Sequence, residues 1–196
     1  ERRISAPVVI NAAGVLAAEV GRMAGVEIPI TPRRGQILVT AAVSPFLRHC
    51  LISAQYVAAK FNPGLAAEGG MGFSVEQSDA GNVLIGSTRE FVGFDRRTTF
   101  EGIRTIASRI APVIPALRRV PVIRTFAGLR PYTPDGLPIL GTVAGIGGFF
   151  MAAGHEGDGI ALSAITGELI AELVGTGRTQ FPLDAFRLER FREGAA

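Results

Sequence analysis

Hydrophobic and polar positions follow two different patterns along the chain. Near its start, Pro7 to Gly14 is a short apolar run that ends in small residues, which is typical of a buried parallel strand followed by a tight turn. The alanine-rich segment from Val15 to Met23 predicts a helix, and Gly25 is a suitable residue to end it. The chain therefore opens with a strand, a turn and a helix.

From Ile28 to Val92 the pattern becomes that of β-strands, because apolar residues alternate with polar ones or form short runs between turn residues. The turn formers of Ser78 to Asn82 predict a hairpin. We expect these strands to form an antiparallel sheet. They are predicted at Gly35–Thr40, Cys50–Phe61, Gly72–Gln77 and Val83–Ser87.

Helical spacing returns between Thr98 and Val113, where apolar residues three and four positions apart form one face that should cover this sheet. The rest of the chain predicts a strand at Val120–Leu129, tight turns from Pro131 to Gly136, a buried strand at Gly147–Ala153, a helix at Gly159–Val174 and a short helix within Leu183–Phe191. Strand and helix pieces at both ends thus flank a mostly antiparallel block, which is an α+β arrangement. The only stretch near a G-x-G-x-x-G turn, Gly145 to Phe150, has phenylalanine at the last glycine position.

Composition excludes several classes of protein. The 196 residues are 47% hydrophobic and 19% charged, an ordinary balance for a soluble protein. A net charge of +3 without blocks of like charge argues against nucleic-acid binding. The longest nearly uncharged apolar stretch, Gly136 to His155, is broken by Pro138 and glycines, so no membrane span is expected. One cysteine and two histidines supply no metal-ligand set, and we expect a reduced, cytoplasmic setting without a signal peptide.

The stretch from Gly154 to Gly159 is the most informative candidate site. It lies between a predicted strand and a predicted helix, where backbone N–H groups and the positive helix end are available to a ligand. Its three glycines permit close approach of an aromatic or anionic group. The alternative is a glycine-rich helix cap with a solvated His155, in which Asp158 caps the helix.

Arg130 and Tyr56 are the candidate substrate-binding residues. Arg130 follows an apolar strand and precedes a proline, so its guanidinium stands at a strand end and offers a fork to a carboxylate. The hydroxyl of Tyr56 reaches the same carboxylate if the strand Cys50–Phe61 lines the cleft. The alternatives are a surface arginine and a packing tyrosine, and no serine hydrolase elbow or carboxylate pair offers a competing chemistry.

Three motifs resemble the FAD-dependent D-amino-acid oxidase superfamily, in its glycine oxidase and sarcosine oxidase branch. They are Val8 to Gly14, Pro32-Arg33-Arg34-Gly35-Gln36, and Gly128-Leu129-Arg130-Pro131 to Gly141 followed by Ala153 to Ile160. The forms His155-Glu156-Gly157-Asp158-Gly159 and Gly86 to Asp95 look most like β subunits of hydroxyproline or opine dehydrogenases. Glycine oxidases carry arginine where Gly157 stands here.

The resemblance implies that this chain is the C-terminal half of such a protein, with the dinucleotide-binding glycines upstream. Residues 1–27 and 141–196 would then belong to a Rossmann-like FAD-binding domain, and residues 28–140 would form the substrate domain. It also implies that Arg130 binds the substrate carboxylate and acts as the catalytic residue. The implied FAD-binding residues are Ala13, Gly14, Gly154, His155, Glu156, Gly157, Asp158, Gly159 and Ile160.

The implied reaction is oxidation of a C–N bond in an amino acid or secondary amine, by hydride transfer to flavin N5. Such chemistry needs no acid or base side chain, since the cofactor performs the hard step and protein groups orient the substrate. Partner subunits of a multi-subunit dehydrogenase are a further expectation. Two alternatives stay open: a non-catalytic module that binds carboxylates or contacts a subunit, and an oxidase that passes electrons to oxygen.

Overall fold

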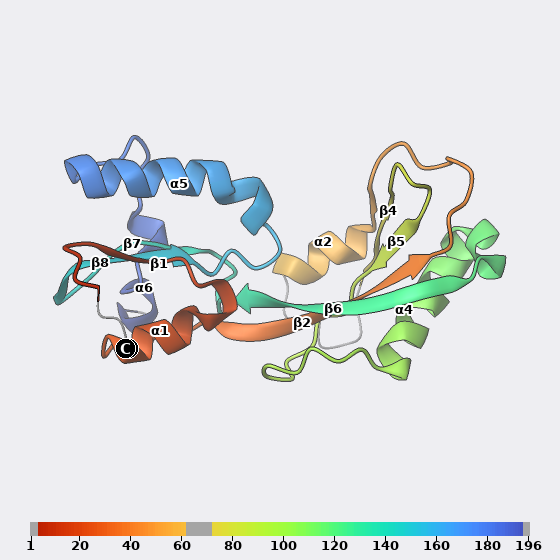
Figure 1. The fold of residues 1–196 in the computed structure, drawn as a ribbon, viewed down its shortest axis with the longest axis horizontal. Coiled ribbons are helices and arrows are strands. Elements are labelled where there is room, and N and C mark those ends of the chain that lie inside the picture. The colour runs from red at the N-terminus through yellow and green to blue at the C-terminus, as the bar shows by residue number, and fades with distance from the viewer. Residues whose placement is uncertain (1–3, 62–71, 194–196) are drawn as a thin grey trace. The chain divides into compact units, whose positions relative to one another are not determined.

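The structure is a computed structural model that describes residues 4–61 and 72–193 (Figure 1). It divides into unit 1, Glu1–Pro32 with Arg130–Ala196, and unit 2, Arg33–Leu129. The sequence placed the middle domain at residues 28–140, and these domain boundaries stay a prediction. Within unit 1 the backbone N–H of Glu156 donates to the carbonyl of Pro131 at 3.2 Å. The roles assigned to these parts by resemblance stay predictions.

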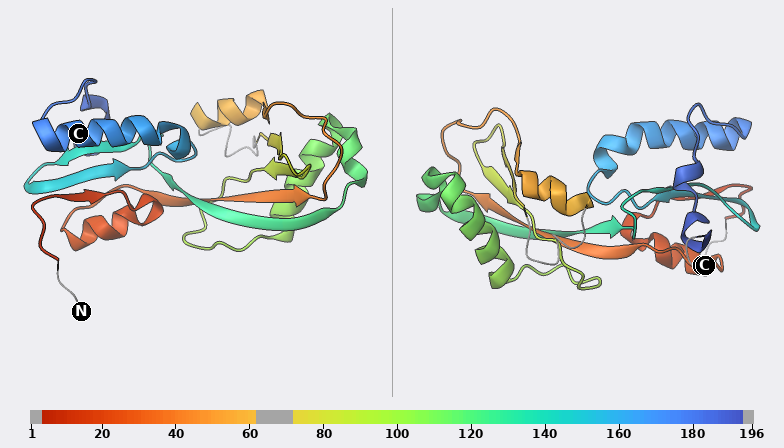
Figure 2. Two further views of the ribbon diagram at one scale, coloured as in Figure 1. Left: turned by 45° about the horizontal axis from the view of Figure 1, so that its top comes forward. Right: turned by 180° about the vertical axis from the view of Figure 1, so that it is seen from behind.

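Unit 1 is built on a three-stranded sheet in the order β1 (Val9–Asn11), β8 (Ile146–Ala153) and β7 (Ile139–Val143). Strand β1 runs parallel to β8, with Val9 opposite Phe149, and β7 is antiparallel to β8. Helix α5 (Gly159–Thr176) lies on one side of the sheet and α1 (Ala17–Met23) on the other (Figures 1 and 2). Short helices η1 (Gly14–Leu16), η3 (Asp184–Phe186) and α6 (Arg190–Glu193) complete the unit.

The core of unit 1 forms between the sheet and α1. Met151 and Ile139 are fully buried there with Ala17, and Leu188 of the C-terminal segment joins them. This packing explains the alanine-rich helix of the sequence, because small side chains let α1 approach the sheet closely. A Cβ at Gly21 of α1 would lie closer to Ile28 Cδ1 than van der Waals contact allows, so a larger residue does not fit there.

Unit 2 contains a five-stranded sheet in the order β3, β4, β5, β2, β6. The pairs β3 with β4, β4 with β5 and β5 with β2 are antiparallel, which confirms the expected antiparallel block and the α+β class. Strands β2 and β6 are long and continue past the ends of unit 2. The strands are β2 (Thr31–Thr40), β3 (Leu51–Ile52), β4 (Ser74–Gln77), β5 (Val83–Gly86) and β6 (Val122–Tyr132).

Helix α4 (Phe100–Val113) covers one face of this sheet, as its spacing predicted. Ile106 and Ile110 are buried against Leu38, Val75 and other strand residues in a second core. The helix begins after Thr99, whose side-chain oxygen accepts a hydrogen bond from the N–H of Gly102 at 3.1 Å. The short helix η2 (Pro115–Arg119) follows it.

Several predicted elements were wrong in kind or extent. The predicted strand Cys50–Phe61 is strand only at β3 and then becomes helix α2 (Ala54–Phe61), because its alanines favour helix over strand. In place of the single predicted helix within Leu183–Phe191 there are two shorter ones, the 3-10 helix η3 and the α-helix α6, which runs on to Glu193. Helix α5 extends beyond Val174 and ends at Gly177, which has the left-handed conformation of a helix C-cap at φ +71°.

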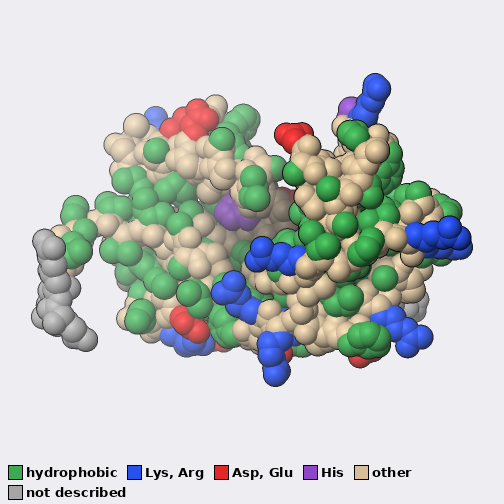
Figure 3. All heavy atoms as spheres, turned by 45° about the vertical axis from the view of Figure 1, so that its right-hand side comes forward, with side chains coloured by type: hydrophobic (Ala, Val, Ile, Leu, Met, Phe, Trp, Pro, Cys, Tyr) green, Lys and Arg blue, Asp and Glu red, His purple; other side chains and the backbone are tan. Residues whose placement is uncertain are grey.

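Helix α5 has the length and composition of a membrane-spanning helix, although no such span was expected from the sequence. Only 17% of its 18 residues are buried in the structure. Helices of soluble proteins also reach this length and composition, and α5 carries Glu168 and Glu172. Hydrophobic side chains also reach the surface elsewhere (Figure 3), and Ile160 at the start of α5 is 94% exposed.

Candidate functional site

The side chain of Arg130 stands near the end of β6 and faces the loop between β8 and α5. Its Nε lies 3.8 Å from Oε1 of Glu156, and the two side chains are 19% and 7% exposed. The proline after Arg130 keeps the backbone extended, so the guanidinium is presented at the strand end as predicted. An ion pair of this length is weaker than one with a direct hydrogen bond between its charged groups.

The loop from Gly154 to Asp158 owes its course to backbone conformations that favour glycine. Gly154 has φ +86°, and a Cβ there would lie 2.7 Å from Thr133 Cγ2. Glu156 has φ +49°, which is uncommon for a residue with a side chain. Its Oε2 accepts a hydrogen bond from the N–H of Gly157 at 2.7 Å, and this local bond helps to hold the conformation. Asp158 precedes α5, but its side chain makes no capping hydrogen bond, contrary to the capping alternative.

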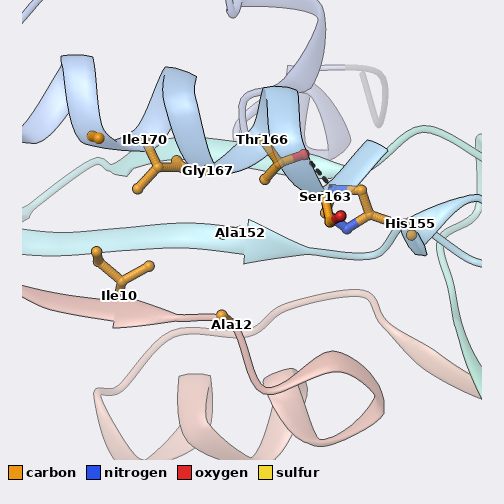
Figure 4. A pocket seen from close by; sticks show the side chains of 10 residues that line it. Ile10, Ala12, Ala152, His155, Ser163, Thr166, Gly167 and Ile170 are labelled. Atoms are coloured by element: carbon orange, nitrogen blue, oxygen red, sulfur yellow. Dashed lines mark hydrogen bonds between the residues drawn. The ribbon is translucent and has the colours of Figure 1, made fainter. Parts of the chain in front are cut away.

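His155 is fixed against the first turns of α5. Its Nε2 lies 3.0 Å from Oγ1 of Thr166, in a half-buried position (Figure 4). Burial lowers the pKa of His155 below its ordinary value of 6.5, and the nearby charge of Asp158 opposes this shift. The histidine is therefore neutral at neutral pH and acts as a hydrogen-bonding wall residue.

The turn after β1 places small residues beside His155 and the loop 154–158. Asn11 is buried, its Nδ2 donates to the carbonyl of Ala17 at 2.9 Å, and its Oδ1 accepts from the N–H of Ala13 at 3.3 Å. These bonds tie the strand end to the start of α1. As a result Ala12 and Gly14 line the cavities of unit 1, whereas Ala13 does not.

Two neighbouring cavities of unit 1 collect these residues. The one that contains Arg130 measures about 430 Å³ and is lined by Ala12, Gly14, Arg130, Pro131, Ala152, Ala153, Gly154, His155, Glu156, Gly157, Gly159 and Ile160. The other measures about 450 Å³, is mostly apolar and runs along α5 (Figure 4), with Ile10, Ala12, Ala152, His155, Gly159, Ser163, Thr166, Gly167, Ile170 and Ala171 as its lining. Of the predicted cofactor residues, Ala13 and Asp158 are absent from both linings.

Sequence reasoning missed the wall that α5 contributes. Gly159, Ser163, Gly167 and Ala171 repeat every four residues along the cavity, and their small side chains leave space there. The signal was in the sequence, since a spacing of four places residues on one helical face. Hydrophobicity alone does not mark these residues, because glycine, serine and alanine contribute little to an apolar pattern.

Tyr56 belongs to the other unit of the structure. It lies on α2, within unit 2, and its ring has the guanidinium carbon of Arg89 4.3 Å from its centroid. The predicted contact between Tyr56 and a carboxylate bound at Arg130 stays a prediction. No group of three or more potential metal-ligating side chains lies together within residues 4–61 and 72–193.

The motifs Pro32 to Gln36 and Gly86 to Asp95 contact each other through side-chain hydrogen bonds and ion pairs. Arg34 donates from Nε and Nη2 to the carboxylate of Glu90 at 3.2 and 2.8 Å, and its Nη1 lies 3.3 Å from Oδ2 of Asp95. Gln36 Nε2 and Thr88 Oγ1 donate to the same Glu90 oxygen at 2.8 and 2.6 Å. Burial alone would raise the pKa of Glu90, but these hydrogen bonds outweigh it and lower the pKa.

The buried His155 predicts a pH dependence of stability. The unfolded histidine takes up a proton near pH 6.5 before the folded one does, so the free energy of unfolding should fall as pH drops through about 6.5. We expect His155→Gln to reduce this loss, as measured by urea denaturation at pH values on both sides of 6.5. His49→Gln, at the exposed second histidine, serves as the control and should keep it. Equal pH slopes in the parent and His155→Gln would contradict the prediction.

Comparison with known proteins finds one family model, described as DAO, FAD dependent oxidoreductase, that matches residues 1–173. The chain is 39% identical over 183 residues to the hydrogen cyanide synthase subunit HcnC of Pseudomonas protegens, covering 93% of this chain and 40% of the relative. It is 31% identical to glycine oxidase of Geobacillus kaustophilus over 95% of this chain and 45% of that protein.

A solved structure resembles the whole described fold. The structure of L-proline dehydrogenase from P. horikoshii superposes with a TM-score of 0.83 at 28% identity, over 95% of this chain and 47% of that one. The chain therefore spans less than half the length of each relative compared with it.

Proposed function

The chain belongs to the DAO family of FAD-dependent oxidoreductases, and we propose that it is the C-terminal part of an enzyme that oxidises the C–N bond of an amino acid or secondary amine. The observation that carries the proposal is the cavity of about 430 Å³ along which Arg130 and the glycine-rich loop 154–159 lie together. The cavity contains the Arg130 guanidinium, which can bind a carboxylate, and a wall of small residues against which a planar ring can pack. The relatives named as glycine oxidase and L-proline dehydrogenase support this class of substrate.

The residues of the cavity fit a flavin. Glycines and alanines form most of its lining, and a Cβ at Gly154 would fill the space next to Thr133. Backbone N–H groups at the start of α5 carry the positive end of the helix dipole, which favours negative charge on a bound group. We propose Gly14, Gly154, His155, Glu156, Gly157, Gly159 and Ile160 as the FAD contacts of this chain, with Ala12 added. Ala13 and Asp158 do not line the cavity. They would contribute by shaping the backbone of the turn after β1 and of the loop before α5.

FAD, when bound, supplies the acceptor for the hydride that leaves the substrate. The task of the chain is then to orient the substrate, and Arg130 would do so by pairing with its carboxylate. Glu156 would limit the positions of the Arg130 side chain, since the two carry opposite charges 3.8 Å apart. His155 would stay neutral and exclude water from the wall of the cavity.

The exposed face of α5 supports the view that more protein covers it. Much of this apolar helix is accessible in the chain, since only 17% of its residues are buried. We propose that the remaining part of the FAD-binding domain packs there, in a cytoplasmic protein. A partner subunit is the further proposal, supported by the description of HcnC as a subunit.

The test uses the absorption spectrum of the full-length protein and of this chain. The full-length protein should contain flavin, and anaerobic addition of the right amino acid or secondary amine should bleach it. The chain alone should purify with little flavin, because the pyrophosphate-binding turn supplies much of the anchoring. If no carboxylate-bearing amine reduces the flavin, the oxidation reaction is contradicted and the non-catalytic binding module becomes the better interpretation. Full flavin content in this chain alone would contradict the expected division of the site.

A further inference from the structure

Arg89 is an unusual arginine of unit 2, because the described residues offer its buried nitrogens an aromatic ring but no hydrogen-bond acceptor. It lies between Thr88 and Glu90, whose side chains hydrogen-bond to each other at 2.6 Å and so share one side of the backbone. Side chains alternate in extended backbone, which sends Arg89 to the opposite side. There its guanidinium carbon lies 4.3 Å from the centroid of the Tyr56 ring.

Part of the Arg89 guanidinium is buried without hydrogen-bond partners. Its Nε and Nη1 atoms are buried, and neither has a hydrogen-bond partner among the described residues. Buried polar groups in native proteins nearly always have a partner, and a charged one that lacks it is costly. A tyrosine face attracts the cation but accepts none of its N–H hydrogen bonds in the guanidinium plane.

Arg34 offers a comparison, because its buried guanidinium has acidic partners within this chain. Arg34 has the carboxylates of both Glu90 and Asp95. Glu90, the acid next to Arg89 in sequence, is committed to that network and lies on the other side of the backbone. The partner of Arg89 must therefore come from outside the described residues.

We propose that Arg89 and Tyr56 form a binding site for a small carboxylate. A guanidinium offers planar, forked donors that match two carboxylate oxygens, and stacking on Tyr56 fixes the plane in which they point. This goes beyond the proposed function, which gives the carboxylate contact to Arg130, and it does not depend on flavin chemistry. Inorganic oxyanions share part of this chemistry, and the experiment separates them from carboxylates.

The experiment follows the arginine Nε–Hε NMR signals of the full-length protein labelled with ¹⁵N at arginine. The signal of Arg89 is the one missing from Arg89→Lys, and that of Arg130 is the one missing from Arg130→Lys. Sodium acetate is added against sodium chloride at equal ionic strength, and sodium phosphate is added in a separate series. We expect a saturable shift of the Arg89 signal with acetate that chloride does not produce. Exposed Arg104 of α4 is the internal control and should respond alike to both salts.

Tyr56→Leu provides the matched variant and should weaken acetate binding at Arg89 severalfold while the Arg89 signal remains. Equal responses of Arg89 to acetate and chloride would overturn the proposal and leave the Arg89 and Tyr56 pair as a structural contact. A shift with phosphate but none with acetate would overturn the carboxylate assignment. If Arg89→Lys fails to fold, through-bond assignment of the parent signals replaces it. Because the readout is a shift at Arg89 itself, its failure is distinct from a failure of flavin reduction.

Discussion

Arg130→Ala in the full-length protein is expected to lower kcat/KM for a carboxylate-bearing amine by about tenfold to a hundredfold. A charge-assisted contact to the substrate carboxylate is worth about 1.5–3 kcal/mol, and the variant removes it. Steady-state kinetics with the substrate identified by flavin bleaching provides the measurement. Arg130→Lys should recover only part of the loss, because an ammonium is a point charge and lacks the fork.

The controls for Arg130 must separate substrate binding from assembly of the cavity. Flavin content is measured in every variant, and rates are expressed per bound flavin. Glu156→Gln keeps the shape of the partner but removes its charge, so it tests the ion pair at 3.8 Å without deleting the arginine. If Arg130→Ala turns over the substrate as well as the parent does, the carboxylate contact is withdrawn and Arg130 is a structural residue.

Arg34→Met should strongly destabilise unit 2. The Arg34 side chain is 4% exposed and bonds Glu90 through two nitrogens, so its removal leaves a partly buried carboxylate without its main cation. Breaking a buried ion pair by removing one partner costs about 3 kcal/mol or more. Urea denaturation of the chain, followed by circular dichroism, should therefore show a markedly lower midpoint.

Arg97→Met is the matched control for Arg34→Met. Arg97 pairs with Asp95, which also faces Arg34, but its side chain is 86% exposed, so its loss should hardly move the midpoint. The double variant Arg34→Met with Glu90→Leu should regain part of the stability, since no charge is then left unpaired. Equal midpoints for Arg34→Met and Arg97→Met would show that the Arg34 and Glu90 pair contributes no more than a surface ion pair.

The sequence predicted those parts of the fold in which local pattern and burial agree. The α4 helix was found because its apolar spacing of three and four is the face that packs on the sheet. The strand and turn before α1 were found from the apolar run and the small residues after it, although only Asn11 of β1 is buried and Val9 and Ile10 are exposed. The α2 segment was mistaken for a strand because its alternation is weak and its alanines were given too little weight.

The candidate site was predictable at Arg130 and at the loop after β8, where residue types with special chemistry stand at element ends. The ion pair between Arg130 and Glu156 was not, because it depends on the left-handed conformation of Glu156 and on a backbone bond to Pro131. The orphaned guanidinium of Arg89 was equally inaccessible to sequence reasoning. The sequence does not show on which side of the backbone an arginine lies, and that side decides whether its guanidinium meets an acceptor.

The pairing of β1 with β8 has a consequence for the order in which the chain can fold. Val9 pairs with Phe149, on the far side of unit 2 in the sequence, so this pairing cannot form until both strands have been synthesised. The contacts of unit 2 lie within one continuous segment, Arg33–Leu129, and its hairpin of β4 and β5 closes over a short turn. Local contacts cost less loop-closure entropy than distant ones, which favours early formation of unit 2. During synthesis, the pairing of β1 with β8 must therefore wait until unit 2, which lies between them in the sequence, has been made.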